Sequence, residues 1–83
     1  MRRIPFTLEN IKAGNVFRYI GDDYLITKVS EDNPYTVELL DVSIDERYRG
    51  TVYHDYTFNP VIFTRPNASL WSKDSPLTVE EML

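Results

Sequence analysis

A chain of 83 residues with no cysteine and a formal net charge of −4 excludes two separate cores, a disulfide framework, a thiolate metal site and a thiol nucleophile. Aromatic residues make up 13% of the chain, and this enrichment favours strands over helices. No apolar stretch reaches the length of a leader peptide or a membrane span, so we expect a cytoplasmic protein that does not associate with a membrane.

The chain is expected to begin with a helical turn and a hairpin. Within 7–14, two apolar residues three positions apart and a glycine predict one helical or 3₁₀ turn. Two β-rich runs at 16–20 and 24–29 flank a three-residue connection of turn formers at 21–23. This spacing predicts a β-hairpin.

Three further strands are expected after the hairpin. The first covers 35–43, where the apolar positions change parity midway, as a bulge or a bend would produce. The next two cover 47–53 and 56–64. Pro60 marks the last one as an edge strand or a bulge, because proline cannot donate to a ladder. Together these elements predict a mainly β fold, a small five-stranded antiparallel SH3-like barrel over residues 1–65.

Residues 66–83 are expected to form a C-terminal tail. A polar connector with the only tryptophan precedes Thr78 and Glu81, whose capping-box spacing predicts a final short helical turn. The apolar side chains of this tail either cap an open end of the barrel or bind a partner, and the sequence leaves both alternatives open. They are Leu70, Trp71, Met82 and Leu83.

The first hairpin carries a pattern of glycine, aromatic and turn positions. Its sequence is Gly14-Asn15-Val16-Phe17-Arg18-Tyr19-Ile20-Gly21-Asp22-Asp23-Tyr24-Leu25-Ile26. This pattern resembles the opening hairpin of small SH3-like barrel proteins of bacteriophage and prophage open reading frames. The resemblance implies a small accessory or host-interacting protein, and it assigns no functional residue because no catalytic or ligand motif is part of it.

The sequence carries no catalytic motif, so we expect a protein that is not an enzyme and holds no cofactor or metal. His54 is the only histidine, and Asp55 follows it. Neighbouring strand residues point to opposite faces, so we expect both to be turn residues between the last two strands. No nucleophile, phosphate loop or metal-ligand spacing accompanies them, and the adjacent acidic pairs lack the spacing of a calcium loop.

The predicted function is therefore non-enzymatic binding of a macromolecule. We expect a phage-type accessory protein or inhibitor that binds a host protein, and an unpaired strand edge also allows a homodimer. Besides the apolar residues of the tail, the candidate partner-binding residues are two acidic pairs in predicted turns. They are Asp22, Asp23, Asp45 and Glu46.

Two alternative functions remain open. In the first, the four adjacent acidic pairs, at 22–23, 31–32, 45–46 and 80–81, gather on one side of the barrel and imitate the charge of a nucleic-acid backbone. In the second, the barrel binds single-stranded nucleic acid through its one basic and aromatic cluster, although the acidic net charge disfavours this. The residues of that cluster are Arg47, Tyr48, Arg49, Tyr53 and Tyr56.

Overall fold

The computed structural model describes residues 1–73 and contains one antiparallel sheet of six strands with two short 3₁₀ helices. The strands are β1 (Arg2–Ile4), β2 (Asn15–Tyr19), β3 (Asp22–Val29), β4 (Thr36–Asp41), β5 (Val52–Thr57) and β6 (Ala68–Ser72). The helices are η1 (Leu8–Asn10) and η2 (Pro60–Thr64). Within residues 1–73, neither η1 nor η2 is long and apolar enough to cross a membrane.

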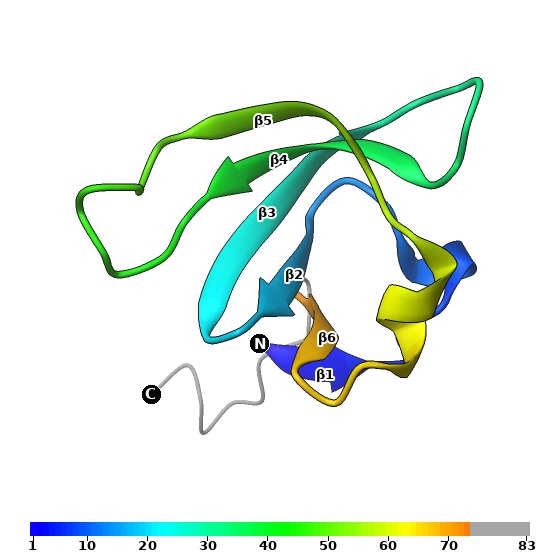
Figure 1. Ribbon diagram of the computed structural model, residues 1–83, viewed down its shortest axis with the longest axis horizontal. Coiled ribbons are helices and arrows are strands. Elements are labelled where there is room, and N and C mark those ends of the chain that lie inside the picture. Colours follow the sequence, from blue (N-terminus) through cyan, green and yellow to red (C-terminus); the bar gives the residue numbers. More distant parts are fainter. Residues whose placement is uncertain (74–83) are drawn as a thin grey trace, which may run out of the picture.

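The strand order in the sheet is β1-β6-β2-β3-β4-β5 (Figure 1). Strands β2 to β5 follow one another as a meander, and each pairs with the next. After β5 the chain passes through η2 and returns, so that β6 lies between β1 and β2. In the described part of the chain the edge strands β1 and β5 do not pair, so six strands form an open sheet where a five-stranded barrel was expected.

The core lies on one face of this sheet, called here the inner face. Phe17 on β2 is 2% exposed, and its ring packs edge-on against Phe58 with the ring centroids 5.0 Å apart. The core residues that belong to strands occupy alternate positions, so their side chains share this face. They are Ile11, Phe17, Ile26, Val37, Leu39, Phe58, Ala68 and Leu70.

The opposite, outer face carries a row of apolar residues at matching register. Successive pairings join them across five strands, from β6 to β5. They are Trp71, Val16, Leu25, Leu40 and Val52. Arg18, also on this face, lies over the Trp71 ring at 4.6 Å from its centroid. The sheet therefore has two distinct apolar surfaces.

The N-terminal helical turn and the first hairpin are confirmed, as η1 and as β2 with β3. The strands expected at 47–53 and 56–64 are wrong, because this region holds the single strand β5 between a loop and η2. Turns precede β5, and the backbone oxygen of Asp45 accepts two amide hydrogen bonds there. Pro60 begins η2, with the Asn59 side chain accepting from the amide of the residue after it, because proline suits the first position of a helix.

The expected polar connector after residue 65 is also wrong, because it contains β6. Ala68 and Leu70 alternate with Ser69 and Trp71, which is a strand pattern too short to stand out among its polar neighbours. The change of parity expected within 35–43 is absent from β4, whose residues alternate regularly between buried and partly buried. The shifts of register lie in its two neighbours, β3 and β5. The expected helical turn near the C-terminus lies outside the described residues.

Candidate functional site

A groove lined by aromatic side chains opens at one end of the inner face. Strands β2, β3 and β5 contribute its four tyrosines, and the buried Phe17 and Leu39 form its floor. The cavity has a volume of about 190 Å³. Its tyrosines are Tyr19, Tyr24, Tyr53 and Tyr56.

Strand register explains why two of these tyrosines share the inner face. Tyr24 pairs with the core residue Phe17, and Tyr19 follows Phe17 by two positions on β2. Because side chains two positions apart on a strand point to the same face, both tyrosines lie on the face that carries the core.

A β-bulge brings the other two tyrosines to the same groove. Tyr53 pairs with Leu39, and Tyr56 pairs with Val37. Between these two pairs β5 has two residues, 54 and 55, where β4 has one, residue 38. Within this bulge Asp55 has a φ of 56°, the left-handed conformation that such an extra residue often takes. Without the bulge, residues three positions apart would face opposite sides of the sheet.

The tyrosine rings hold one another in place. Tyr24 and Tyr53 meet edge-on with centroids 5.9 Å apart, and Tyr19 stacks on Phe17 at 5.8 Å with 14° between the ring planes. Such pairs stabilise by about 0.5–1.5 kcal/mol beyond the burial of their area. The outermost ring, Tyr53, remains 38% exposed. The groove is therefore a preformed aromatic surface that solvent reaches.

Two carboxylates share the inner face with the groove. Asp41 pairs directly with Tyr24, and Asp22 precedes Tyr24 by two positions. Burial, followed by the negative charges of Asp22 and Asp41, raises the pKa of Tyr24, and burial also raises the pKa of Tyr56. Asp41 is only 2% exposed, and its Oδ1 accepts hydrogen bonds from the amide and the hydroxyl of Ser43.

The β2–β3 turn and the β4–β5 loop lie at the same end of the sheet (Figure 1). The amide of Val42 donates to the backbone oxygen of Asp23 at 3.0 Å, which joins the two connections. Both carry apolar side chains in solvent, among them Ile20 in the turn and Ile44 in the loop. This end of the molecule therefore combines the open groove with exposed apolar residues.

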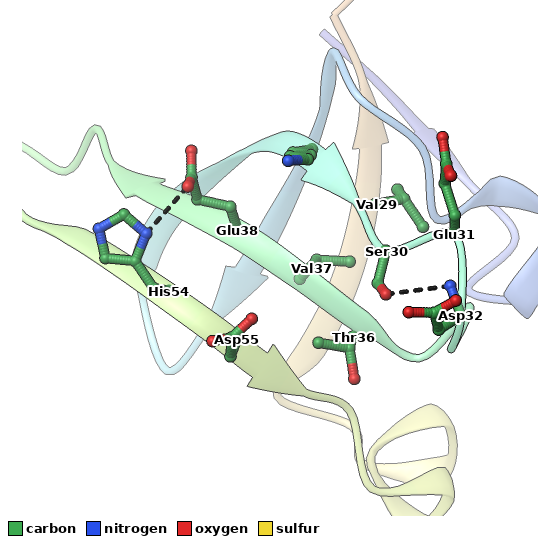
Figure 2. Close-up of a pocket in the computed structure, with 10 residues that line it drawn as sticks. Val29, Ser30, Glu31, Asp32, Thr36, Val37, Glu38, His54 and Asp55 are labelled. Carbon is green, nitrogen blue, oxygen red and sulfur yellow. Dashed lines mark hydrogen bonds and ion pairs between the residues drawn. The ribbon is translucent and has the colours of Figure 1, made fainter.

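A second, polar depression lies along β3, β4 and β5, near the end of β3 that is opposite to the groove. Figure 2 shows His54 and Glu38 facing each other across β5 and β4, with Nδ1 of the histidine 2.9 Å from Oε2 of the glutamate. His54 and Asp55 are not turn residues as expected, because they form the bulge inside β5, and both border this depression. Solvent reaches 72% of the His54 side chain. Within residues 1–73 no three histidine, cysteine or acidic residues gather as metal ligands.

The predicted basic cluster divides into two parts. Tyr53 and Tyr56 lie in the groove, whereas Arg47, Tyr48 and Arg49 lie in the β4–β5 loop. Arg47 binds both carboxylate oxygens of Asp45, at 3.2 and 2.9 Å, and lies over the Tyr48 ring at 5.4 Å. These hydrogen bonds lower the pKa of Asp45. Arg49 lies 3.5 Å from Glu46, so both arginines pair with acidic residues of their own loop.

The acidic pairs occupy two separate places. Asp22 and Asp23 begin β3 at the groove end, where Asp45 and Glu46 also lie, while the pair at 31–32 follows the other end of β3. A strand of this length separates its ends by on the order of 20 Å. These three pairs are therefore not one compact cluster, and the fourth pair, at 80–81, lies outside the described residues.

The apolar residues predicted in the tail also separate. Leu70 is fully buried in the core, so its side chain does not reach the surface. Trp71 lies on the outer face, where its indole N–H donates to Ser69 Oγ at 2.9 Å. Met82 and Leu83 lie outside the described residues.

Comparisons of this chain with protein-family models, with curated proteins and with solved structures found no match. The residues that line the groove therefore take their assignment from geometry alone. Sequence reasoning placed Tyr53 and Tyr56 with the arginines. The two tyrosines of the hairpin were within reach of sequence reasoning, because 17, 19 and 24 share a face once the turn is known to have two residues.

Proposed function

We propose that the protein is a non-enzymatic binding module that holds a segment of a partner protein in the aromatic groove. The observation that carries the proposal is the convergence of four tyrosines from three strands on one preformed groove. Tyrosine rings provide large contact areas at a low cost in side-chain entropy, and they are enriched at the centres of protein interfaces.

The fold that goes with this proposal is an SH3-like barrel, extended by β1. Support comes from the meander of β2 to β5, the 3₁₀ helix η2 and the return of β6 to a place beside β2, all around one core. Together with the resemblance of residues 14–26, this arrangement supports a phage-type accessory protein or inhibitor whose partner is a host protein.

The groove is a better candidate than the polar depression on physical grounds. Glu38 and His54 form a hydrogen bond at the surface, and exposed polar pairs of this kind contribute about 0–1 kcal/mol because water and salt screen them. A partner that covered the depression would have to remove water from several carboxylates, which costs free energy. The groove exposes aromatic carbon instead, and its burial is favourable.

Selection from a displayed library of random peptides tests the proposal while the partner is still unidentified. The wild-type chain is compared with Tyr53→Leu, which removes a groove ring, and with Tyr48→Leu as the matched control. Both tyrosines are surface side chains, 38% and 51% exposed, and Tyr48 lies outside the groove lining. We expect the wild type and Tyr48→Leu to enrich the same peptides and Tyr53→Leu to lose them.

Two outcomes would contradict the proposal. Equal enrichment by Tyr53→Leu and the wild type would place binding outside the groove. A labelled single-stranded oligonucleotide that binds at low salt, with an affinity lowered by Arg47→Ala and unchanged by Tyr53→Leu, would assign the function to nucleic acid and to the β4–β5 loop. Circular dichroism of each variant establishes that it is folded.

A further inference from the structure

The described chain twice surrounds an arginine with an aromatic ring and an aspartate. Arg18 binds both oxygens of Asp23, at 2.6 and 3.1 Å, and lies 4.6 Å from the centroid of the Trp71 ring. Arg47 does the same in its loop, where it binds both oxygens of Asp45 and lies 5.4 Å from the centroid of the Tyr48 ring. A guanidinium group suits both partners at once, because its edge donates to carboxylates and its flat face stacks on aromatic rings.

The groove contains the aromatic component of this arrangement, and the acidic component lies beside it on the same face. Four tyrosines line it, and Asp22 and Asp41 share its face. None of the nine lysine and arginine residues of the chain, all of which lie within residues 1–73, belongs to its lining. Asp22 and Asp41 are not part of the lining either, but both are close enough to Tyr24 for their charges to raise its pKa. The groove therefore has tyrosine rings and two neighbouring carboxylates, with no basic residue in its lining.

Asp41 is the unusual member of this set. It is 2% exposed, and buried carboxylates are commonly paired with a cation because the loss of hydration is costly. Ser43 supplies two neutral hydrogen bonds to one of its oxygens, and within residues 1–73 Asp41 makes no ion pair. A cation brought to the groove by another molecule would compensate its charge.

We propose that the aromatic groove binds an arginine side chain of the partner protein, with the guanidinium group against the tyrosine rings and its charge toward Asp22 and Asp41. This inference rests on the proposed function, since it names the chemistry of the segment that the groove holds. Arginine suits the groove better than lysine does, because a guanidinium is less strongly hydrated than an ammonium and stacks on rings while it donates hydrogen bonds.

Nuclear magnetic resonance titration of the full 83-residue chain tests the inference with defined probes. The first probe is the tripeptide acetyl-Gly-Arg-Gly-amide. The second replaces its arginine by citrulline, which has nearly the same shape and carries no charge. We expect saturable shifts of the Tyr24 and Tyr53 ring signals at millimolar concentrations of the arginine peptide. The citrulline peptide should bind at least about tenfold more weakly.

Two aspartate variants connect the effect to the groove. Asp22→Asn removes a carboxylate from the groove face and should weaken binding of the arginine peptide by about threefold, since it is partly screened by solvent. Asp45→Asn is the matched control, because Asp45 lies at the same end of the sheet and already pairs with Arg47. It should leave binding unchanged.

The inference is overturned if the arginine and citrulline peptides bind equally, if the shifts centre on Tyr48, or if no saturable shift appears up to about 50 mM peptide. In each case peptides selected through Tyr53 would still support the groove as the binding site. Loss of Tyr53 dependence in the library selection would instead contradict the proposed function itself, so the two failures are distinguishable.

Discussion

Ile20 occupies a backbone conformation that a β-branched residue rarely adopts. It has a φ of 50°, and Gly21 follows with a φ of 82°. Since Tyr19 pairs with Asp22, these two residues form a two-residue hairpin turn with positive φ at both positions. Asparagine and aspartate accept this conformation at the first position more easily than isoleucine does. The Ile20 side chain is also 63% exposed, so core packing does not compensate the strain.

We therefore predict that Ile20→Asn stabilises the protein. The free energy of unfolding should rise by about 1 kcal/mol, because the substitution relieves backbone strain and removes an apolar side chain from solvent. Urea unfolding followed by circular dichroism measures the change. Ile44→Asn is the control, since Ile44 is also exposed but has no positive φ, and its effect should stay within about 0.5 kcal/mol. A lower stability of Ile20→Asn would mean that the isoleucine makes a contact that supports the turn.

If Ile20→Asn is indeed more stable, the retention of isoleucine at this position points to a use outside folding. Ile20 lies next to Tyr19, a wall of the groove, at the end of the sheet where other apolar side chains reach solvent. Backbone strain at exposed positions is concentrated at binding sites, where the rest of the fold holds it. Ile20 is accordingly a residue to test for contact with the partner segment.

Some strands were predictable from the sequence and others were not. The hairpin of β2 and β3 was predictable because both runs are rich in β-formers and a glycine separates them. Strand β6 was not, because only Ala68 and Leu70 mark its buried face and serines surround them. Its position between β1 and β2 is a long-range pairing, which local pattern does not contain. Short strands of this kind owe their existence to tertiary packing.

The candidate site was harder to predict than the fold, because it depends on one bulge. Alternation along 52–57 sends Tyr53 and Tyr56 to opposite faces, and only the extra residue near Asp55 returns both to the inner face. No residue type in this segment indicates a bulge, because the position with positive φ holds Asp55 and not the glycine that is common there. The polar depression was missed for the same reason, because the bulge also positions His54.

The groove tyrosines of β3 and β5 should make the stability of the protein depend on pH in the alkaline range. Burial is the main cause that raises the pKa of Tyr24 and Tyr56 above the ordinary value of 10.0. A raised pKa in the folded state means that folding favours the protonated phenols. Their contribution to stability is complete below pH 10 and is lost as the pH rises through the folded-state pKa. The free energy of unfolding should therefore fall above about pH 10.

The test compares the wild type with the double variant Tyr24→Phe/Tyr56→Phe, which keeps the rings and removes the two hydroxyl groups. Urea unfolding between about pH 8 and about pH 11.5 should show a smaller alkaline loss of stability in the double variant. Tyr48→Phe, which alters an exposed tyrosine of the β4–β5 loop, should follow the wild type. Parallel curves for the wild type and the double variant would show that the groove tyrosines ionise as freely in the folded protein as in the unfolded chain.

At the scale of the whole molecule, the core and the groove are built from the same residues. Phe17 and Leu39 belong to the buried core and also form the floor of the groove. A chain of 83 residues has a small core, so its total stability is expected to be modest. Any ligand that binds the folded groove also stabilises the fold by mass action. Stability and binding are therefore coupled, and substitutions in the groove must be judged by both.

Asp41 is the residue at which these two properties should oppose each other. Asn at this position keeps a side-chain oxygen that accepts hydrogen bonds from Ser43. It removes a buried negative charge that forms no ion pair with any residue of 1–73. We predict that Asp41→Asn raises the free energy of unfolding by about 1 kcal/mol, because burial of an uncompensated carboxylate is unfavourable. The same variant should bind the arginine tripeptide about tenfold more weakly, because the guanidinium loses its buried counter-charge.

Urea unfolding and the peptide titration together measure both effects. Asp45→Asn again provides the comparison, since its carboxylate is half-exposed and already paired, and it should change neither quantity by much. A more stable Asp41→Asn that binds arginine less tightly means that the protein retains a destabilising charge for the sake of its ligand. A less stable variant with unchanged binding would instead make Asp41 a structural acceptor for the β4–β5 loop, and the cation of the groove would then have Asp22 as its only carboxylate.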